Sequence, residues 1–228
     1  MAKKEKFRRK QLKEADQFLT MSENVMLFTS KHSKSIMAAS AGVVILILAI
    51  MGFRYNSQVN AMRMEALYSD MTQLIKDKKD QDAKEVRPQL VKMVDEFSDG
   101  SQKLRAKLLL ADFYYRNGDY SQALDLYNAV KSSSKFGDLQ NQLATIGLAY
   151  SYESNKEYKQ GIEMLRDLID NPQGFPLFDV YLSLARCYEL DNSNTKSLQI
   201  LREMQTRFVD HPQLHLVDRQ IKKLSAQA

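Results

Sequence analysis

The chain has few of the residues that crosslink or interrupt a fold. It contains one cysteine, four prolines and eight glycines in 228 residues. Because a single thiol cannot form an intramolecular disulfide, packing alone must hold the fold together. That thiol, Cys187, lies in an apolar stretch, which favours a buried hydrophobic role over a reactive one. The scarcity of proline and glycine leaves long uninterrupted segments and, with their helical apolar spacing, predicts an all-α fold.

Net charge is absent outside the first 34 residues. Residues 1–34 hold nine Lys or Arg and four Asp or Glu, whereas the remaining 194 residues hold 24 of each. The formal net charge of +5 therefore belongs to the N-terminal tail. A short basic tail before an apolar helix is typical of the cytoplasmic side of a membrane span. It is not evidence for nucleic acid, and we expect no nucleic-acid partner.

One long apolar run is present, because the nineteen residues from Ser35 to Phe53 carry no charge. A helix rises about 1.5 Å per residue, so this run matches the roughly 30 Å hydrocarbon core of a bilayer. It predicts a transmembrane signal anchor over residues 35–54. The tail would be cytoplasmic and the C-terminal domain periplasmic in a single-pass protein of the bacterial inner membrane.

Two alternatives to this topology stay open. Val59 and Ala61 have the small-residue spacing of a cleavage site, although the apolar run exceeds the roughly 7 to 15 residues of a signal-peptide core. Basic residues also flank the run on both sides, so the orientation depends on the whole tail. A lipoprotein anchor is excluded, since Cys187 lies too far downstream to carry the lipid. Residues 11–30 of the tail predict an amphipathic helix that lies on the inner leaflet or docks a cytoplasmic partner.

Beyond the membrane, one apolar register recurs three times. The three sets are Leu110, Ala111, Tyr114, Gly118, Tyr120, Ala123, Tyr127 and Val130; Leu148, Ala149, Tyr152, Tyr158, Gly161, Leu165 and Leu168; and Leu184, Ala185, Tyr188, Ser197, Leu201 and Met204. The alanines, glycine and serine allow two antiparallel helices to approach closely, and the aromatic residues fill the gaps. Gly118 provides the left-handed conformation that a tight turn between two helices needs.

This pattern resembles the tetratricopeptide repeat family, whose unit is a pair of helices of about 34 residues. The resemblance implies a helical solenoid, which would follow the N-terminal transmembrane helix predicted from the apolar run. We expect an atypical capping helical pair over residues 57–100, three repeats over residues 101–212 and a C-terminal capping helix over residues 213–228. The last helix is expected to run from Pro212 to Ser225.

The family's binding groove is lined by the first helix of each pair. Projecting its groove positions onto this chain gives candidate partner-binding residues, with a solvated face as the alternative for each of them. The candidates are Arg105, Asp112, Tyr115, Arg116, Tyr150, Glu153, Asp179, Arg186 and Glu189. Both signs of charge occur among them, so no ligand of a single charge is implied. The Lys and Asn residues with which some family members bind a peptide carboxylate are absent.

Catalytic and cofactor motifs are also lacking. The chain has no Gly-rich phosphate loop, no nucleophile elbow and no HExxH zinc motif. His211 and His215 are four residues apart on one predicted helix, but without further ligands they indicate surface histidines rather than a zinc site. We therefore expect no enzyme activity, no cofactor and no metal.

The order of segments, with a basic tail, one anchor and loose repeats, resembles the bacterial ancillary subunit of the Sec translocon. This resemblance implies an adaptor whose protein partners are translocon subunits, secreted chains or periplasmic chaperones. The alternative is an envelope scaffold that coordinates cell division or cell-wall and outer-membrane assembly. A tetratricopeptide coordinator of cell division is similar in the repeats alone.

Overall fold

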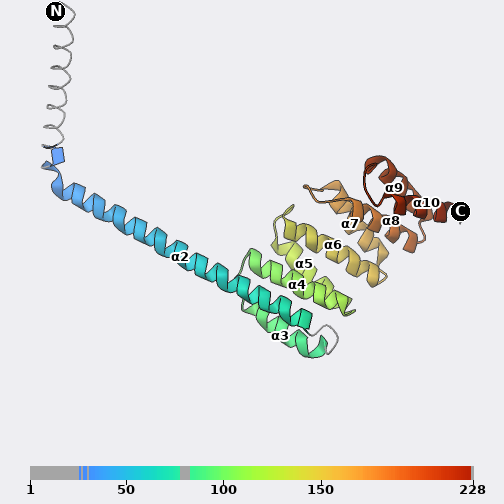
Figure 1. Cartoon of the computed structure of the whole chain (residues 1–228), viewed down its shortest axis with the longest axis horizontal. Coiled ribbons are helices and arrows are strands. Elements are labelled where there is room, and N and C mark those ends of the chain that lie inside the picture. Colours follow the sequence, from blue (N-terminus) through green and yellow to red (C-terminus); the bar gives the residue numbers. More distant parts are fainter. Residues whose placement is uncertain (1–25, 27, 30, 78–82, 227–228) are drawn as a thin grey trace, which may run out of the picture. The chain divides into compact units, whose positions relative to one another are not determined.

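The computed structural model describes residues 26, 28–29, 31–77 and 83–226. Every regular element within these ranges is an α-helix (Figure 1). The helices are α2 (Ser33–Asp77), α3 (Ala83–Asp95), α4 (Ser101–Arg116), α5 (Tyr120–Ser133), α6 (Leu139–Ser154), α7 (Tyr158–Asp170), α8 (Phe178–Leu190), α9 (Asn194–Arg207) and α10 (Leu214–Ser225). The predicted tail helix over residues 11–30 lies outside the described residues, apart from helical Met26, Phe28 and Thr29.

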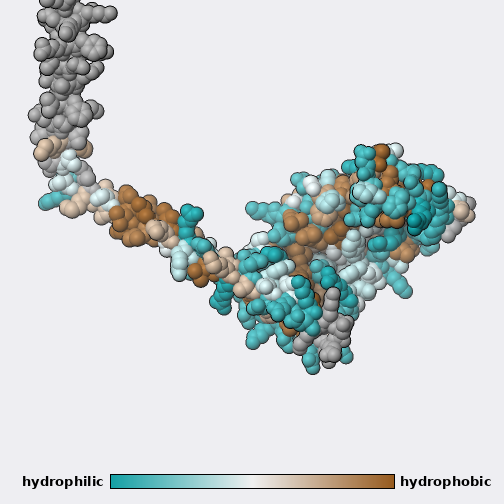
Figure 2. Space-filling view, viewed as in Figure 1, coloured by the Kyte–Doolittle hydropathy of each residue, from teal (hydrophilic) through white to brown (hydrophobic). Residues whose placement is uncertain are grey.

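The chain divides into two compact units, Met1–Ala61 and Met62–Ala228. In the first unit, α2 is long and apolar enough to cross a membrane by length and composition. Its apolar side chains are exposed, with Val44 at 54% and Leu46 at 61% of their full accessibility. Figure 2 shows this run as a continuous hydrophobic stretch along α2.

The second unit begins within α2. A separate helix was expected to start near residue 58, but α2 continues from the apolar run to Asp77 without a break. Residues 54–77 contain neither proline nor glycine, so nothing in the sequence ends the helix there.

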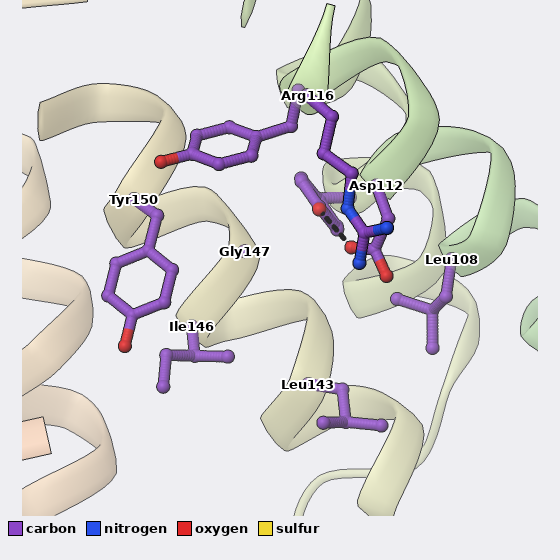
Figure 3. A pocket seen from close by; sticks show the side chains of 9 residues that line it. Leu108, Asp112, Arg116, Leu143, Ile146, Gly147 and Tyr150 are labelled. Carbon is purple, nitrogen blue, oxygen red and sulfur yellow. Dashed lines mark hydrogen bonds between the residues drawn. The ribbon is translucent and has the colours of Figure 1, made fainter. Parts of the chain in front are cut away.

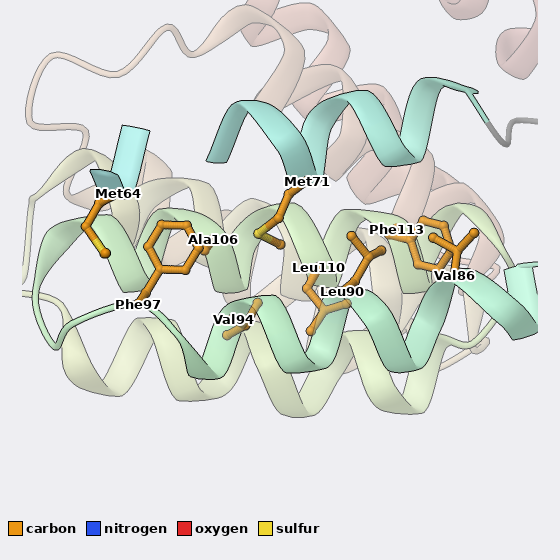
Figure 4. Close-up of a cluster of buried hydrophobic side chains, with 9 residues drawn as sticks. All are labelled: Met64, Met71, Val86, Leu90, Val94, Phe97, Ala106, Leu110 and Phe113. Atoms are coloured by element: carbon orange, nitrogen blue, oxygen red, sulfur yellow. The ribbon is translucent and has the colours of Figure 1, made fainter. Parts of the chain in front are cut away.

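The C-terminal part of α2 shares a hydrophobic cluster with α3 and α4 (Figure 4). Its buried members are Met64, Met71, Val86, Leu90, Val94, Phe97, Ala106, Leu110 and Phe113. The segment that follows the apolar run is thus part of the folded core of the second unit.

The pairs α4/α5, α6/α7 and α8/α9 repeat one turn geometry. A residue in the left-handed region ends each first helix: Gly118 at φ 80°, Lys156 at φ 65° and Asn192 at φ 60°. The next backbone N–H donates to a tyrosine carbonyl five residues earlier: Asp119 to Tyr114 at 3.0 Å, Glu157 to Tyr152 at 2.8 Å and Ser193 to Tyr188 at 2.8 Å. The same helix-capping motif at three matching positions establishes the structural repeat.

Small residues lie where successive helices cross. Those on the first helices are Ala111, Ala149 and Ala185, those on the second helices are Ala123, Gly161 and Ser197, and all six are buried. A Cβ atom added to Gly161 would lie 3.2 Å from the carbonyl oxygen of Ala149, so the approach leaves little space for a side chain. The all-α, tetratricopeptide-like solenoid predicted from the register is therefore confirmed.

Helix α10 covers the last pair. It begins at Leu214, two residues later than predicted, because Pro212 lies in the turn that precedes it. Its buried residues Val217 and Leu224 share a cluster with Leu201 and Met204 of α9. We call the surface formed by α4, α6, α8 and α10, together with the C-terminal part of α2, the first-helix face.

Candidate functional site

All nine candidate residues lie on first helices. Helix α4 carries Arg105, Asp112, Tyr115 and Arg116; α6 carries Tyr150 and Glu153; and α8 carries Asp179, Arg186 and Glu189. The structure brings four of them together around one cavity, namely Asp112, Tyr115, Arg116 and Tyr150. Four others, Arg105, Glu153, Arg186 and Glu189, make contacts between neighbouring first helices. Asp179 is exposed in the first turn of α8 and borders neither that cavity nor those contacts.

The cavity between α4 and α6, which we call the tyrosine cavity, has a volume of about 290 Å³. It is lined by Leu108, Asp112, Tyr115, Arg116, Tyr127, Leu143, Ile146, Gly147 and Tyr150. Figure 3 shows Leu143, Ile146 and Tyr150 along α6, with Asp112 and Arg116 on the facing helix α4. Most of these side chains are apolar or aromatic, with a few polar groups, as is usual for ligand sites.

A hydrogen bond between Tyr127 and Asp112 forms one wall of the tyrosine cavity. The Tyr127 hydroxyl donates to Oδ1 of Asp112 at 2.5 Å. Although Asp112 is open to the cavity, the surrounding protein removes part of its hydration and raises the pKa of its carboxyl; the Tyr127 hydrogen bond and the nearby Arg116 oppose this shift. Burial and the adjacent Asp112 also raise the pKa of Tyr127. The phenol therefore keeps its proton and can donate it to the hydrogen bond with Asp112.

Gly147 lets the Tyr127 ring lie directly against α6. A Cβ atom at this position would lie 2.4 Å from Cε1 of Tyr127, a separation that two carbon atoms cannot adopt without a shift. The ring is almost fully buried, at 3% accessibility, and its hydroxyl is held by Asp112. Glycine is therefore needed here for space rather than for backbone conformation.

An apolar stripe on α6 leads into the tyrosine cavity. Leu139, Leu143, Ile146 and Tyr150 follow helical spacing along one side of the helix, preceded by Phe136 in the loop. Phe136 is 64%, Leu139 60% and Leu143 39% exposed. Figure 2 shows hydrophobic surface over this part of the solenoid. We call these five residues the α6 stripe.

Tyr150 is the one member of the α6 stripe among the residues predicted from the family's groove positions, and Phe136, Leu139, Leu143 and Ile146 are not among them. The signal was present, since α6 carries two apolar registers. Ala144, Leu148 and Ala149 already supply its buried side. Leu139 and Leu143 on the same helix are exposed, whereas Ile146 is half-buried and packs against the core cluster of Ala149 and Leu165.

Polar contacts connect each first helix to the next. They are Arg105 to Glu65 at 3.2 Å, Ser154 to Tyr115 at 3.2 Å, Ser183 to Tyr150 at 3.3 Å, Arg186 to Glu153 at 2.8 and 2.9 Å, Gln220 to Glu189 at 2.5 Å and Lys223 to Glu189 at 2.9 Å. Exposed ion pairs each contribute under about 1 kcal/mol, so their main effect here is to fix how neighbouring helices align. Several charges predicted to face a partner are thus paired within the chain.

Cys187 lies behind one of these contacts. It is fully buried, and its Sγ lies 3.4 Å from Oε2 of Glu153. Burial and the neighbouring carboxylate raise the pKa of the thiol to about 12. At neutral pH the group is therefore a protonated thiol with little nucleophilic character.

The two histidines considered as zinc ligands have other neighbours. The His211 ring stacks on Phe178 with centroids 3.5 Å apart, and Nδ1 of His215 lies 3.1 Å from the carbonyl oxygen of Pro212. In the part of the chain that the structure describes, no three His, Cys, Asp or Glu residues are grouped as a metal site would require.

Residues 28–175 match the model of the tetratricopeptide repeat-like domain family. Two structures of the nearly identical TPR-like repeats of a kinesin light chain from Podosopora anserina, one of them the Q17M variant, are similar in fold. The variant is 16% identical with a TM-score of 0.61, over 71% of this chain and 85% of its own. The other is 15% identical with a TM-score of 0.61, over 71% of this chain and 86% of its own. No curated protein matches the chain at a significant level.

Proposed function

Because the chain belongs to the tetratricopeptide repeat-like domain family, we propose that it is a membrane-anchored adaptor that binds protein partners through its first-helix face. Folds of this family mediate protein–protein interaction and are typically non-catalytic. The observation that carries the proposal is the α6 stripe, which lies at the mouth of the tyrosine cavity. A contiguous apolar surface with polar groups around it is typical of an interaction site.

The dimensions of the site favour an apolar segment of a partner chain. Large side chains at positions 139, 143, 146 and 150 match the spacing with which one helix packs against another. The tyrosine cavity, with a volume of about 290 Å³, can accept one large side chain from such a segment. The phenol groups of Tyr115 and Tyr150 at its edge combine an apolar ring with a hydrogen-bonding group, a property that enriches tyrosine at interfaces.

We place the solenoid on the periplasmic side of a bacterial inner membrane, held by residues 35–53. The basic tail and the apolar run support this topology. The family match supports retention of the anchor, since it begins at residue 28 and so includes the whole run. In this position the first-helix face would meet translocon subunits, secreted chains or periplasmic chaperones.

Cysteine labelling tests the topology. We would compare Ser133→Cys, at an exposed site in α5, with Lys10→Cys in the tail, using a maleimide that cannot cross the inner membrane. Cys187 is buried, so its background labelling should be low. The proposal predicts labelling of Ser133→Cys alone in cells with a permeabilised outer membrane. Labelling of Lys10→Cys alone would contradict the orientation, and a mature protein that begins at Met62 would contradict the anchor.

Photo-crosslinking identifies the partner class. Benzoylphenylalanine would replace Leu143 in the α6 stripe or, as the control, the exposed Gln199 on the second helix α9. The proposal predicts that position 143 captures translocon subunits, secreted chains or chaperones, whereas position 199 does not. Capture of division or cell-wall proteins would instead support the envelope scaffold. Equal products from both positions would contradict binding through the first-helix face.

A further inference from the structure

A second cavity lies at the other end of the first-helix face. Its volume is about 300 Å³, and its lining residues come from α8 and α10, with Leu201 from α9. Leu182, Leu201 and Leu216 provide apolar lining, whereas Arg186, Arg219 and Gln220 provide polar lining. We call it the arginine cavity. It shares no lining residue with the tyrosine cavity, so the two sites can be tested independently.

The positive charges around the arginine cavity differ in their partners. Arg186 donates two hydrogen bonds to the carboxylate of Glu153, at 2.8 and 2.9 Å, so its charge is matched. Lys223 is paired with Glu189 at 2.9 Å. Arg219 is exposed and forms no ion pair or hydrogen bond with any residue that the structure describes. One uncompensated guanidinium therefore lies beside an apolar floor.

We propose that the arginine cavity binds an acidic side chain of a protein partner together with a neighbouring apolar side chain. The apolar group would lie on the half-buried Leu182 and Leu216, and the carboxylate would accept hydrogen bonds from Arg219. A planar guanidinium fits a carboxylate through two parallel hydrogen bonds, and apolar surroundings strengthen them. The inference rests on the proposed adaptor function in one respect, that the ligand is a segment of protein.

This assignment follows from charge complementarity. A neutral apolar segment would cover the floor and remove water from Arg219 without replacing its hydrogen bonds, which is costly. An acidic residue at the edge of the segment satisfies the guanidinium instead. The tyrosine cavity differs, because its arginine, Arg116, already lies beside Asp112. The two ends of the first-helix face are therefore expected to select different side chains.

Peptide titration tests the proposal on the full chain in nanodiscs of neutral lipid. The probe is a fluorescein-labelled, C-terminally amidated peptide with one leucine, one phenylalanine and one glutamate, and its twin carries glutamine instead of glutamate. We expect the glutamate peptide to bind about fivefold tighter, a preference that falls as salt increases. Arg219→Gln should abolish the preference, whereas Lys222→Gln, at an exposed neighbour that does not line the cavity, should preserve it.

Several results would overturn the proposal. These are equal affinity for the two peptides or no detectable binding of either. Loss of the preference in Lys222→Gln would also overturn it, because the overall positive charge of α10, rather than Arg219, would then attract the glutamate. A preference that appears only when the peptide has a free C-terminal carboxylate would overturn the choice of an acidic side chain. Ile146→Asp separates this inference from the adaptor proposal, since it should reduce crosslinking from position 143 but leave the preference for glutamate unchanged, because Ile146 does not line the arginine cavity.

Discussion

The Tyr127 hydroxyl donates a hydrogen bond to Asp112 at 2.5 Å, which joins α5 to α4 at the wall of the tyrosine cavity. The pair links the core of a repeat to its surface, since Tyr127 is 3% accessible and Asp112 faces the cavity. The position of the Tyr127 ring in turn depends on the absence of a side chain at Gly147. Three residues from three helices thus set the shape of the proposed site.

Tyr127→Phe tests the contribution of this hydrogen bond. The variant removes the donor and leaves the ring in place, while water in the cavity can still hydrate Asp112. We therefore expect a loss of about 1 kcal/mol, below the range for a fully buried bond to a charged group. The measurement is thermal unfolding of the detergent-solubilised chain, followed by circular dichroism. An unchanged Tm would contradict the assigned role, and Tyr120→Phe, at a half-buried site in the same helix, is the control.

Asp112→Asn tests the raised pKa of this carboxyl. The folded pKa lies above the ordinary value of 3.8, so the folded state holds the proton more tightly than the unfolded state. The wild-type fold should therefore lose stability as pH rises from 3.8 through the folded pKa, whereas the variant should not. Above that window Asp112→Asn should be the more stable protein, since its amide oxygen can still accept from Tyr127.

Asp99→Asn is the control with the opposite sign. Lys103 holds the pKa of the exposed Asp99 below its ordinary value through a hydrogen bond and its charge. Its contribution to stability is therefore present at neutral pH and is lost as pH falls through the lowered pKa. Melting curves measured between acidic and neutral pH check both variants. The same pH response in both would contradict the assigned environments.

Gly147→Ala should distort the tyrosine cavity. The added Cβ would meet the Tyr127 ring at 2.4 Å, so the ring or α6 must move, at a cost of about 1 to 3 kcal/mol. Gly161→Ala is the comparison, because its Cβ would meet the Ala149 oxygen at 3.2 Å and requires a smaller shift. Urea unfolding of both variants measures the difference. Equal losses, or a larger loss at Gly161, would contradict the tight fit at Tyr127.

Lys156→Gly should stabilise the second repeat. Lys156 adopts φ 65°, a left-handed conformation that costs a residue with a Cβ about 1 kcal/mol and that glycine adopts freely. Glycine also gains freedom in the unfolded chain, so we expect a net gain of about 0.5 kcal/mol. Gly118→Lys, at the matching position of the first repeat, should have the opposite effect. The measurement is the Tm of both variants, which should rise for Lys156→Gly and fall for Gly118→Lys. A Tm that shifts in the same direction in both would contradict this interpretation.

The repeat was predictable because it depends on local spacing. Leu110, Tyr114 and Gly118 fall at positions that specify a helix, its buried side and its end, and the same positions recur downstream. The continuity of α2 could also have been predicted, since residues 54–77 lack proline and glycine. A membrane helix and a core helix were expected as separate elements because their apolar patterns differ, yet one helix can change surroundings along its length.

The candidate site was predictable in position but not in chemistry. Family register placed Asp112, Tyr115, Arg116 and Tyr150 on first helices, where they line one cavity. Ion pairs such as Glu153 with Arg186 join residues of different repeats. The sequence does not show whether such a side chain is free in solvent or paired with a residue of the neighbouring repeat. Leu143 was not among the predicted site residues, although it is exposed on a first helix and lines the tyrosine cavity.

The most direct test of the adaptor account is the crosslinking yield from position 143 in cells. It would be measured in the otherwise wild-type chain, in Ile146→Asp and in the matched control Gln199→Asp, with Tm used to confirm that each variant folds. A charge in the middle of the α6 stripe opposes contact with an apolar segment, so we predict at least about a fivefold fall in yield for Ile146→Asp and no change for Gln199→Asp. An undiminished yield from a folded Ile146→Asp variant would contradict binding through the first-helix face.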